Sequence, residues 1–176
     1  MSNLQNAGSW LFEILLTFYS LALLLRLLLQ WVKADYRNPL IQVLVAVTDP
    51  LVKPLRKLLP PWGRLDSTCL ALFILSTALI VSLWDPMAST PMLIAARTIV
   101  RILHVVLSLY SILIIVSIVL SWVGQSFRHP IIPLIYKLTE PILIPIRKFL
   151  PSAGGFDFSA VVALVTIHFL RLLVGY

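Results

Sequence analysis

One Pro-rich stretch occurs twice in this sequence, and the second copy follows the first without a gap at an offset of 91 residues, as from Pro39 to Pro130. The identical positions of the first copy are Pro39, Ile41, Thr48, Pro50, Pro54, Arg56, Lys57, Leu59, Pro60, Gly63 and Asp66. Their counterparts are Pro130, Ile132, Thr139, Pro141, Pro145, Arg147, Lys148, Leu150, Pro151, Gly154 and Asp157. Asp49 and Glu140 keep an acid at one further position. An internal repeat of this kind indicates two tandem structural units.

The repeat extends into the apolar segment before each Pro-rich stretch. The same offset places Trp31 opposite Trp122, and it places the pair Tyr19 and Ser20 opposite Tyr110 and Ser111. We therefore predict a first unit over residues 1–91 and a second over residues 92–176.

Composition identifies the class of protein. Of the 176 residues, 60% are hydrophobic and only 12% are charged, whereas a soluble domain carries about 25% charged residues. Such a chain is expected to be an integral membrane protein. The net charge of +7 fits cations that flank apolar helices better than it fits nucleic-acid binding, which we do not expect.

Four apolar runs are long enough to be membrane-spanning helices, so the predicted fold is all-α with two spans per unit. These spans cover residues 10–32, 66–84, 102–123 and 158–176, and the linkers inside the units cover residues 33–65 and 124–157. Two spans per unit give both units the same direction in the bilayer, as tandem parallel repeats related by a pseudo-twofold axis along the membrane normal.

Most Lys and Arg residues lie in the two linkers, which the positive-inside rule places in the cytoplasm. In a Gram-negative host the protein would then be a multi-pass inner-membrane protein with both termini in the periplasm. Arg97 and Arg101, beside the short connection between the units, argue weakly for the opposite orientation.

Each linker is predicted to form two short helices, because Asn38 with Pro39 and Thr48 with Pro50 both resemble helix starts. After Pro50 the apolar residues and the cations fall on opposite faces, which is typical of an amphipathic helix. Pro54 and Pro145 lie inside this pattern and should kink the helix or limit it to one turn. We expect the linkers to lie in the headgroup region or to enter the membrane as re-entrant hairpins.

The cations of the linkers have two interpretations. They could bind anionic lipid headgroups, the carboxylates of a partner protein or the counter-charge of a translocated ion, or they could be ordinary interfacial anchors. The candidate lipid- or partner-binding residues are Lys53, Arg56, Lys57, Arg147 and Lys148.

The acids kept in both units also have two interpretations. Asp49, Glu140, Asp66 and Asp157 could coordinate a cation or form ion pairs with the Arg-Lys pairs of the other unit. They could instead cap helix N-termini, and this is the better explanation for Asp66 and Asp157.

A few ionisable residues lie inside the predicted spans, where charge is costly and therefore points to function. Those near a span end could instead extend their charged groups toward the interface. The candidates are Glu13, Arg26, His104, His168 and Arg171, of which Glu13 and His104 are equivalent in the two units.

Nothing in the sequence has the pattern of an active site. The histidines lack metal-ligand spacing, and there is no Gly-rich phosphate loop and no nucleophile elbow. Cys69 is the single cysteine, which excludes an intramolecular disulfide or a thiolate metal cluster. The start of the chain lacks the basic residues and the cleavage site of a signal peptide. We predict a non-enzymatic protein without a cofactor.

The motif order resembles the YggT family of small bacterial membrane proteins, which is related to the YlmG proteins of plastids and Gram-positive bacteria. The shared pattern is an acid followed by Pro50, then Pro54, Arg56 with Lys57, Pro60, Gly63 and Asp66, present in two copies. This resemblance implies a role in tolerance of osmotic shock.

Two molecular activities are compatible with that role. The protein could be a scaffold or assembly factor that contacts anionic lipids and membrane-protein partners or forms a homo-oligomer, as the links of YlmG proteins to cell division and cytochrome assembly imply. It could alternatively be a component of a potassium channel or transporter, as the link of YggT relatives to potassium uptake implies.

Overall fold

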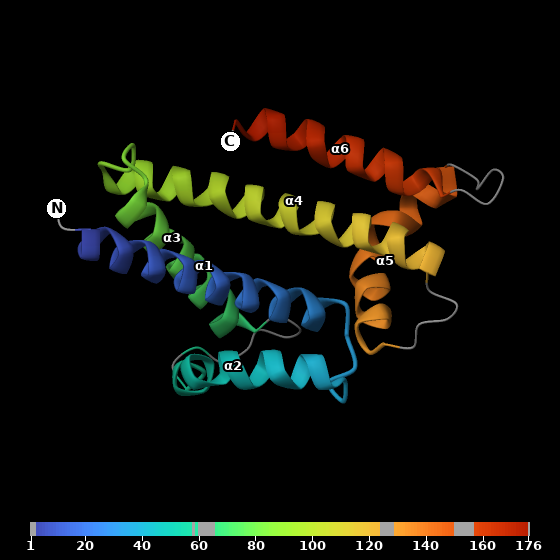
Figure 1. Cartoon of the computed structure of the whole chain (residues 1–176), viewed down its shortest axis with the longest axis horizontal. Helices are drawn as coiled ribbons and strands as arrows, with labels where there is room; N and C mark the ends of the chain where they lie inside the picture. Colours follow the sequence, from blue (N-terminus) through green and yellow to red (C-terminus); the bar gives the residue numbers. More distant parts are fainter. Residues whose placement is uncertain (1–2, 58, 60–65, 124–128, 150–156, 176) are drawn as a thin grey trace. The chain divides into compact units, whose positions relative to one another are not determined.

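The computed structural model describes residues 3–57, 59, 66–123, 129–149 and 157–175. Within these ranges all regular structure is helical (Figure 1). The helices are α1 (Asn3–Trp31), α2 (Pro39–Leu55), α3 (Ser67–Trp84), α4 (Pro91–Val123), α5 (Ile131–Phe149) and α6 (Phe158–Val174). The chain divides into two compact units, residues 1–102 and residues 103–176, and the division falls inside α4.

In the part of the chain that the structure describes, three helices are long and apolar enough to cross a bilayer. They are α1 over 26 residues from Asn6, α3 over 18 residues and α4 over 32 residues, against a requirement of about 20 residues. Helix α6 is equally apolar but has 17 residues. The predicted third span lies inside the longer helix α4, which includes both Arg97 and Arg101. The predicted first span lies inside α1 except for Val32, which follows the end of that helix.

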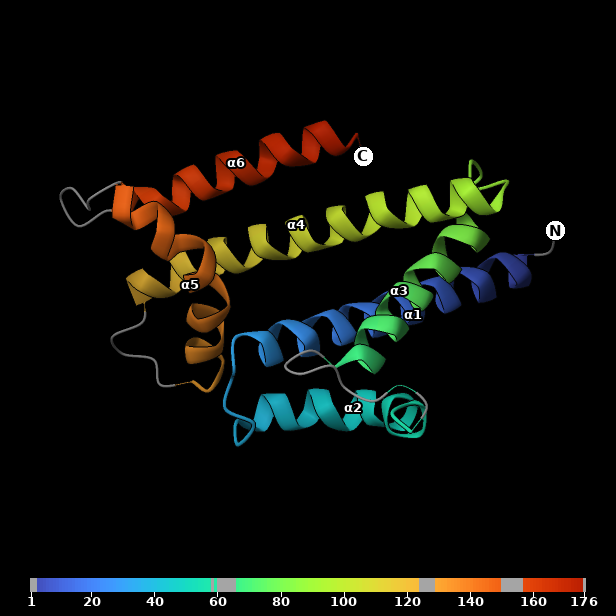
Figure 2. The same ribbon diagram turned by 180° about the vertical axis from the view of Figure 1, so that it is seen from behind.

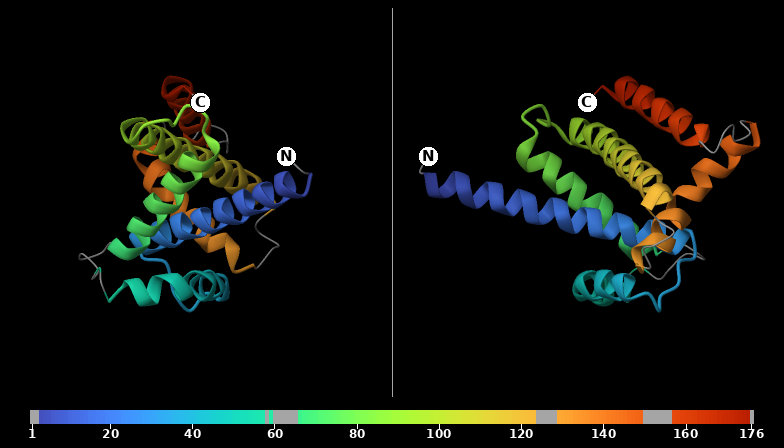
Figure 3. Two further views of the ribbon diagram at one scale, coloured as in Figure 1. Left: turned by 90° about the vertical axis from the view of Figure 1, so that its left-hand side faces the viewer. Right: turned by 45° about the vertical axis from the view of Figure 1, so that its right-hand side comes forward.

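The core of the first unit forms where α1 packs against α3. Figures 2 and 3 show the two helices side by side, crossing at an angle. Leu23 and Leu27 of α1 and Phe73 and Ile80 of α3 are buried. The hydroxyls of Ser20 and Thr77 lie 3.3 Å apart and join the two helices, so this contact combines apolar packing with the interhelical hydrogen bonding typical of membrane helices.

Helix α2 packs against both α1 and α3. Its N-cap is Asn38, whose side-chain oxygen accepts a hydrogen bond of 2.9 Å from the backbone N–H of Leu40, and Pro39 occupies the first turn. This start is confirmed as predicted. In the second unit, Nδ1 of His129 accepts a bond of 3.3 Å from the N–H of Ile131 at the start of α5.

The prediction of two short helices per linker is wrong. Helix α2 continues through Pro50 and Pro54, and α5 continues through Pro141 and Pro145. A proline removes one helical N–H but has a φ angle compatible with a helix, so a bend replaces the break. Figure 1 shows both helices changing direction within their length.

A repeated threonine lies two residues before the first internal proline of each linker helix. The Thr48 hydroxyl donates to the carbonyl oxygen of Leu44 at 2.8 Å, and the Thr139 hydroxyl donates to that of Ile135 at 3.0 Å. Both side chains are fully buried. Bonds of this type from Thr to the preceding turn bend helices, which accounts for the presence of Thr in both copies.

The start of the helix after each linker is capped by the repeated aspartate, as predicted. Asp66 accepts a bond of 3.3 Å from the backbone N–H of Cys69, and Asp157 accepts one of 3.0 Å from that of Ser159. Pro60, Gly63, Pro151 and Gly154 of the repeated motif lie outside the described residues.

Candidate functional site

The repeated arginine of each linker forms an ion pair with the capping aspartate of the next helix. Arg56, which follows α2, binds Asp66, and Nε of Arg147 near the end of α5 donates to Asp157 at 2.9 Å. We call each of these a linker ion pair. Both occur ten residues apart in the chain, so the repeat preserves a contact that holds the linker helix to the next helix of its own unit.

The linker ion pairs keep both aspartates ionised. Burial raises the pKa of Asp66, but the hydrogen bonds from Arg56 and from the Cys69 N–H outweigh it and hold this pKa below its ordinary value. Burial likewise raises the pKa of Asp157, and the bonds from Arg147 and Ser159 lower it further than burial raises it. The aspartate of the first unit is only 1% exposed, so its charge depends on Arg56.

A second ionic contact joins α1 to α2 within the first unit. Nη1 of Arg26, a side chain that is 6% exposed, donates to the Asp49 carboxylate at 2.8 Å and to the Thr48 hydroxyl at 2.5 Å. Nζ of Lys53 lies 2.9 Å from the other oxygen of Asp49. We call Arg26, Thr48, Asp49 and Lys53 the ionic cluster.

The ionic cluster corrects one interpretation of the acids. Asp49 lies inside α2 and Glu140 inside α5, so neither caps a helix. The cationic partners of Asp49 come from its own unit. Burial raises the pKa of Asp49, but the bonds from Lys53 and Arg26 bring it below its ordinary value. Arg26, a candidate ionisable residue of the first predicted span, therefore pairs with a carboxylate of the linker helix.

The ionic cluster is specific to the first unit. At the offset of the repeat, Ser117 replaces Arg26 and Ile144 replaces Lys53, while an acid remains as Glu140. The second copy therefore lacks both cations of the ionic cluster. Glu140 is exposed on α5, whereas Asp49 is largely covered.

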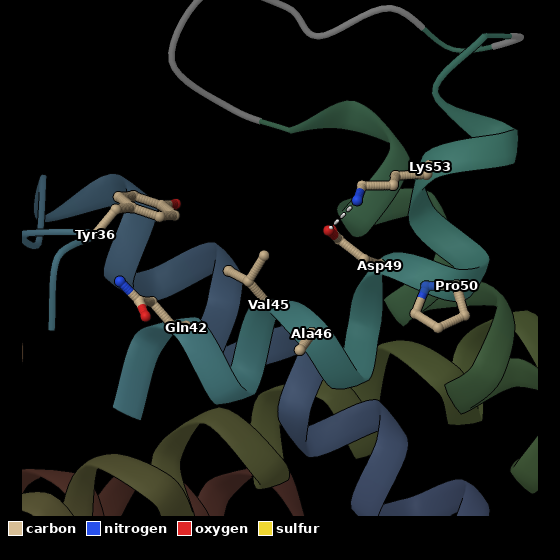
Figure 4. A pocket seen from close by; sticks show the side chains of 7 residues that line it. All are labelled: Tyr36, Gln42, Val45, Ala46, Asp49, Pro50 and Lys53. Carbon is tan, nitrogen blue, oxygen red and sulfur yellow. Dashed lines mark ion pairs between the residues drawn. The ribbon is translucent and has the colours of Figure 1, made fainter. Parts of the chain in front are cut away.

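Two adjoining cavities open beside the ionic cluster. The larger has a volume of about 670 Å³ and is lined by Tyr36, Gln42, Val45, Ala46, Asp49, Pro50 and Lys53 (Figure 4). The second, of about 340 Å³, is lined by Arg26, Gln30, Tyr36, Val45, Asp49, Lys53, Arg56 and Asp66. They share several lining residues and together form what we call the polar cavity.

The polar cavity brings together side chains from α1, α2 and both ends of the linker. Figure 4 shows Tyr36 and Gln42 at one end, Asp49 and Lys53 at the other, and Val45 between them. Burial raises the pKa of Tyr36 more than the nearby Arg26 lowers it, so the phenol stays protonated and can donate a hydrogen bond. Sequence reasoning identified Arg26, Asp49 and Lys53 but missed Tyr36, Gln30 and Gln42, which belong to no repeated motif.

The remaining candidates are not among the residues that line the polar cavity. Lys57 and Lys148 are exposed beside their linker ion pairs, and His168 is exposed on α6. Arg171 is half-buried on α6, and His104 is half-buried on α4. Glu13 lines a separate cavity of about 250 Å³ along α1 with Trp10, Ile14, Thr17, Phe18 and Leu21. Among the residues that the structure describes, no three or more His, Cys, Asp or Glu side chains are grouped to hold a metal ion.

Comparison with known proteins gives a family match over both units. A model of the CCB3/YggT family matches residues 5–87 and again residues 96–176. The chain is 32% identical over 169 residues to the uncharacterized protein YggT of Escherichia coli strain K12, with 96% of this chain and 89% of that protein covered. It is also 32% identical over 179 residues to an uncharacterized protein of Pseudomonas aeruginosa, with 99% of this chain and 91% of that protein covered. No solved structure matches the chain.

Proposed function

The chain belongs to the CCB3/YggT family, and from this premise we propose that it is a non-enzymatic inner-membrane scaffold that acts in tolerance of osmotic stress. In this proposal α1, α3, α4 and α6 cross the bilayer, and the linker helices α2 and α5 lie along its cytoplasmic surface. The linkers present basic side chains to anionic lipid and to other membrane proteins.

The observation that carries this proposal is the division of α2 into three faces. Ile41, Thr48 and Val52 form a buried face on the helix that packs against α1 and α3. A second, apolar face is exposed and consists of Leu40, Val43, Val47 and Leu51. The third face is polar and includes Gln42, Asp49 and Lys53.

A helix with these three faces fits the membrane interface. Positions 40, 43, 47 and 51 follow helical spacing, so the exposed apolar face is one continuous stripe that acyl chains can cover. The polar face then points to the headgroups and to water. A helix lying in the interface accounts for an apolar stripe and a polar face on one element, which favours this location over a re-entrant hairpin.

The linker ion pairs support a scaffold because they hold the linker helices in place. Lys57 and Lys148 follow Arg56 and Arg147 directly and are exposed. An interfacial helix that carries a basic end, held to the next span, presents its positive charge at a constant position. Surfaces of this kind recognise anionic lipid and acidic partner segments.

The test compares partner recovery by crosslinking from native membranes. Reversal of Arg56 or Arg147 would also break a linker ion pair, so the informative variant is Lys57→Glu with Lys148→Glu. We expect this variant to insert normally and to lose the partners that wild type recovers. Arg37→Glu, which changes another exposed cation of the linker, is the matched control and should recover them. Equal recovery by all three proteins would refute the scaffold.

Ion handling is the second candidate, because the polar cavity contains the carboxylates Asp49 and Asp66 beside a span. Both carboxylates already pair with cations of the protein, so a conducted potassium ion would have to displace Arg26, Lys53 or Arg56. Purified protein in liposomes under an osmotic gradient tests this candidate. Potassium flux that Asp49→Asn abolishes would favour it over the scaffold.

A further inference from the structure

We propose that the polar cavity of the first unit binds the phosphate-bearing headgroup of one anionic phospholipid. This inference rests on the proposed position of α2 at the membrane interface and adds a defined lipid site to it. The site consists of Tyr36, Gln42 and Lys53, supported by Arg26 and Arg56.

The charges of the polar cavity favour an anion. Its lining contains the cations Arg26, Lys53 and Arg56 and the carboxylates Asp49 and Asp66. Each carboxylate is already in an ion pair, Asp49 with two cations and Asp66 with one. One positive charge therefore remains in excess, and a bound cation would increase it, whereas one phosphate charge would neutralise it.

Hydrogen-bond donors are available around the same space. Lys53 has three N–H donors and is 73% exposed despite its contact with Asp49. Within the described residues, Arg26 makes its hydrogen bonds to Thr48 and Asp49 through Nη1, and a guanidinium has donors on two further nitrogens. The Tyr36 phenol and the Gln42 amide line the opposite end of the cavity (Figure 4). Phosphate oxygens accept bonds from donors of all these types.

The depth and size of the site fit a headgroup that remains attached to its lipid. Arg26 lies five residues before the end of α1 at Trp31, which is ~7.5 Å along the helix axis. That distance places its guanidinium near the boundary between the hydrocarbon and the headgroups. Val45, Ala46 and Pro50 provide apolar lining, and the apolar stripe of α2 lies on the same helix, so acyl chains can follow the stripe while the phosphate enters the cavity.

The second unit is a natural control, because it lacks these donors. At the offset of the repeat the residues opposite Arg26, Tyr36, Gln42 and Lys53 are Ser117, Phe127, Pro133 and Ile144. The linker ion pair is present in both units, so its arginine alone does not define the site. We therefore expect one bound lipid per chain.

Native mass spectrometry of the purified full chain in detergent tests the proposal, with added phosphatidylglycerol as the anionic probe and phosphatidylcholine as the zwitterionic one. Wild type should retain one phosphatidylglycerol molecule about tenfold more strongly than phosphatidylcholine. Lys53→Ile, which installs the residue of the second unit, should lower this retention about tenfold. Lys57→Ile removes a neighbouring cation outside the cavity and should change it less than twofold.

Three results would overturn the proposal. The first is that wild type retains phosphatidylglycerol no more strongly than phosphatidylcholine. The second is that the Lys53 and Lys57 variants lose retention equally. The third is that inorganic phosphate at equal concentration displaces the lipid, which would indicate a site for free phosphate. If Lys53→Ile fails to fold, Tyr36→Phe removes only a hydroxyl and should still weaken retention several-fold. The scaffold test changes Lys57 and Lys148, whereas the lipid test changes Lys53. Partner recovery can therefore fail while lipid retention persists.

Discussion

At the scale of single residues, Arg26 shows why the ionic cluster must act as a unit. A guanidinium that is 6% exposed on a membrane helix is costly unless a carboxylate and hydrogen bonds compensate its charge. Asp49 and Thr48 supply both. Removal of the carboxylate should therefore destabilise the protein more than removal of the whole pair.

The first prediction follows from this asymmetry. We expect Asp49→Leu to lower the free energy of unfolding by about 3 kcal/mol, because it leaves Arg26 buried without its carboxylate. Arg26→Leu with Asp49→Leu should recover part of that loss. The measurement is thermal unfolding in detergent, with Glu140→Leu, an exposed acid at the equivalent position, as a control expected within about 0.5 kcal/mol of wild type. A double variant no more stable than Asp49→Leu would contradict the prediction.

The second prediction concerns pH. The pKa values of Asp49, Asp66 and Asp157 are all lowered in the folded state, so these groups stabilise the fold fully above the unfolded-state value of about 3.9. Their contribution is lost as the pH falls through the lower folded-state pKa values. The melting temperature should stay level from pH 7 to about pH 5 and fall below about pH 4. Asp66→Asn should make that fall shallower, and an unchanged acid profile would show that the aspartates do not cause it.

Some contacts of these residues could be predicted from the sequence and others could not. Capping by Asp66 could be predicted because a cap depends on neighbours along the chain, and it is repeated at Asp157. The pairing of Arg26 with Asp49 depends on how α1 packs on α2, which no local pattern specifies. One signal was available, since the second unit lacks the counterparts of both Arg26 and Lys53, and joint loss of two cations is expected when both contact one acid.

At the scale of elements, the linker ion pair determines how a bent linker helix joins the next apolar helix. Arg56 is bound to the same carboxylate that caps α3. Loss of the arginine should therefore weaken both the contact of α2 with α3 and the first turn of α3. Sequence reasoning expected Pro54 to kink the helix or limit it to one turn, and it divided the linker into two helices at Thr48 and Pro50. Only that division is wrong, because α2 continues through both prolines.

The third prediction uses Cys69 as a reporter of that first turn. Its side chain is fully buried three residues after Asp66, so a maleimide should label it slowly in wild type. We expect Arg56→Gln to accelerate labelling about tenfold, because Asp66 loses its ion pair and α3 opens more often at its start. Mass spectrometry of the labelled protein measures the rate.

The second unit supplies the control for this experiment. Arg147→Gln should leave the labelling of Cys69 unchanged, because Arg147 pairs with Asp157. In a Cys69→Ser background, Ala160→Cys places a thiol at the equivalent position, which is 2% exposed. Arg147→Gln should then accelerate its labelling. Acceleration of Cys69 labelling by both arginine variants alike would mean that the effect is a general loss of stability.

At the scale of the whole molecule, the duplication keeps the linker ion pair in both units and the ionic cluster in one. A contact present in both copies serves the architecture that they share, whereas a contact present in one copy can serve a separate task.

The direction of the two units in the bilayer is the premise of the proposed function. Composition and the repeat predict a common direction, and the structure adds one relevant contact.

That contact concerns the cations that argued for the opposite orientation. Nε of Arg97 lies 3.9 Å from the Asp85 carboxylate, and its Nη2 donates to the Met87 sulfur at 2.9 Å. The positive charge beside the short connection is thus partly compensated within the fold. The linkers also carry the exposed cations Lys57 and Lys148. From the number of Lys and Arg residues in the linkers, the positive-inside rule predicts that both linkers are cytoplasmic.

The fourth prediction is that reporter tags inserted after Pro60 and after Pro151 are both cytoplasmic, while a tag after Met87 is periplasmic. Helices α3 and α4 lie between the two linkers, and two crossings return the chain to the side that it left. The linkers therefore share a side if both of these helices span the bilayer. Protease accessibility of the tags in spheroplasts and in inverted vesicles measures the sides. Tags after Pro60 and Pro151 on opposite sides would mean that the units face opposite ways, and α2 and α5 could not then present their cations to the same leaflet.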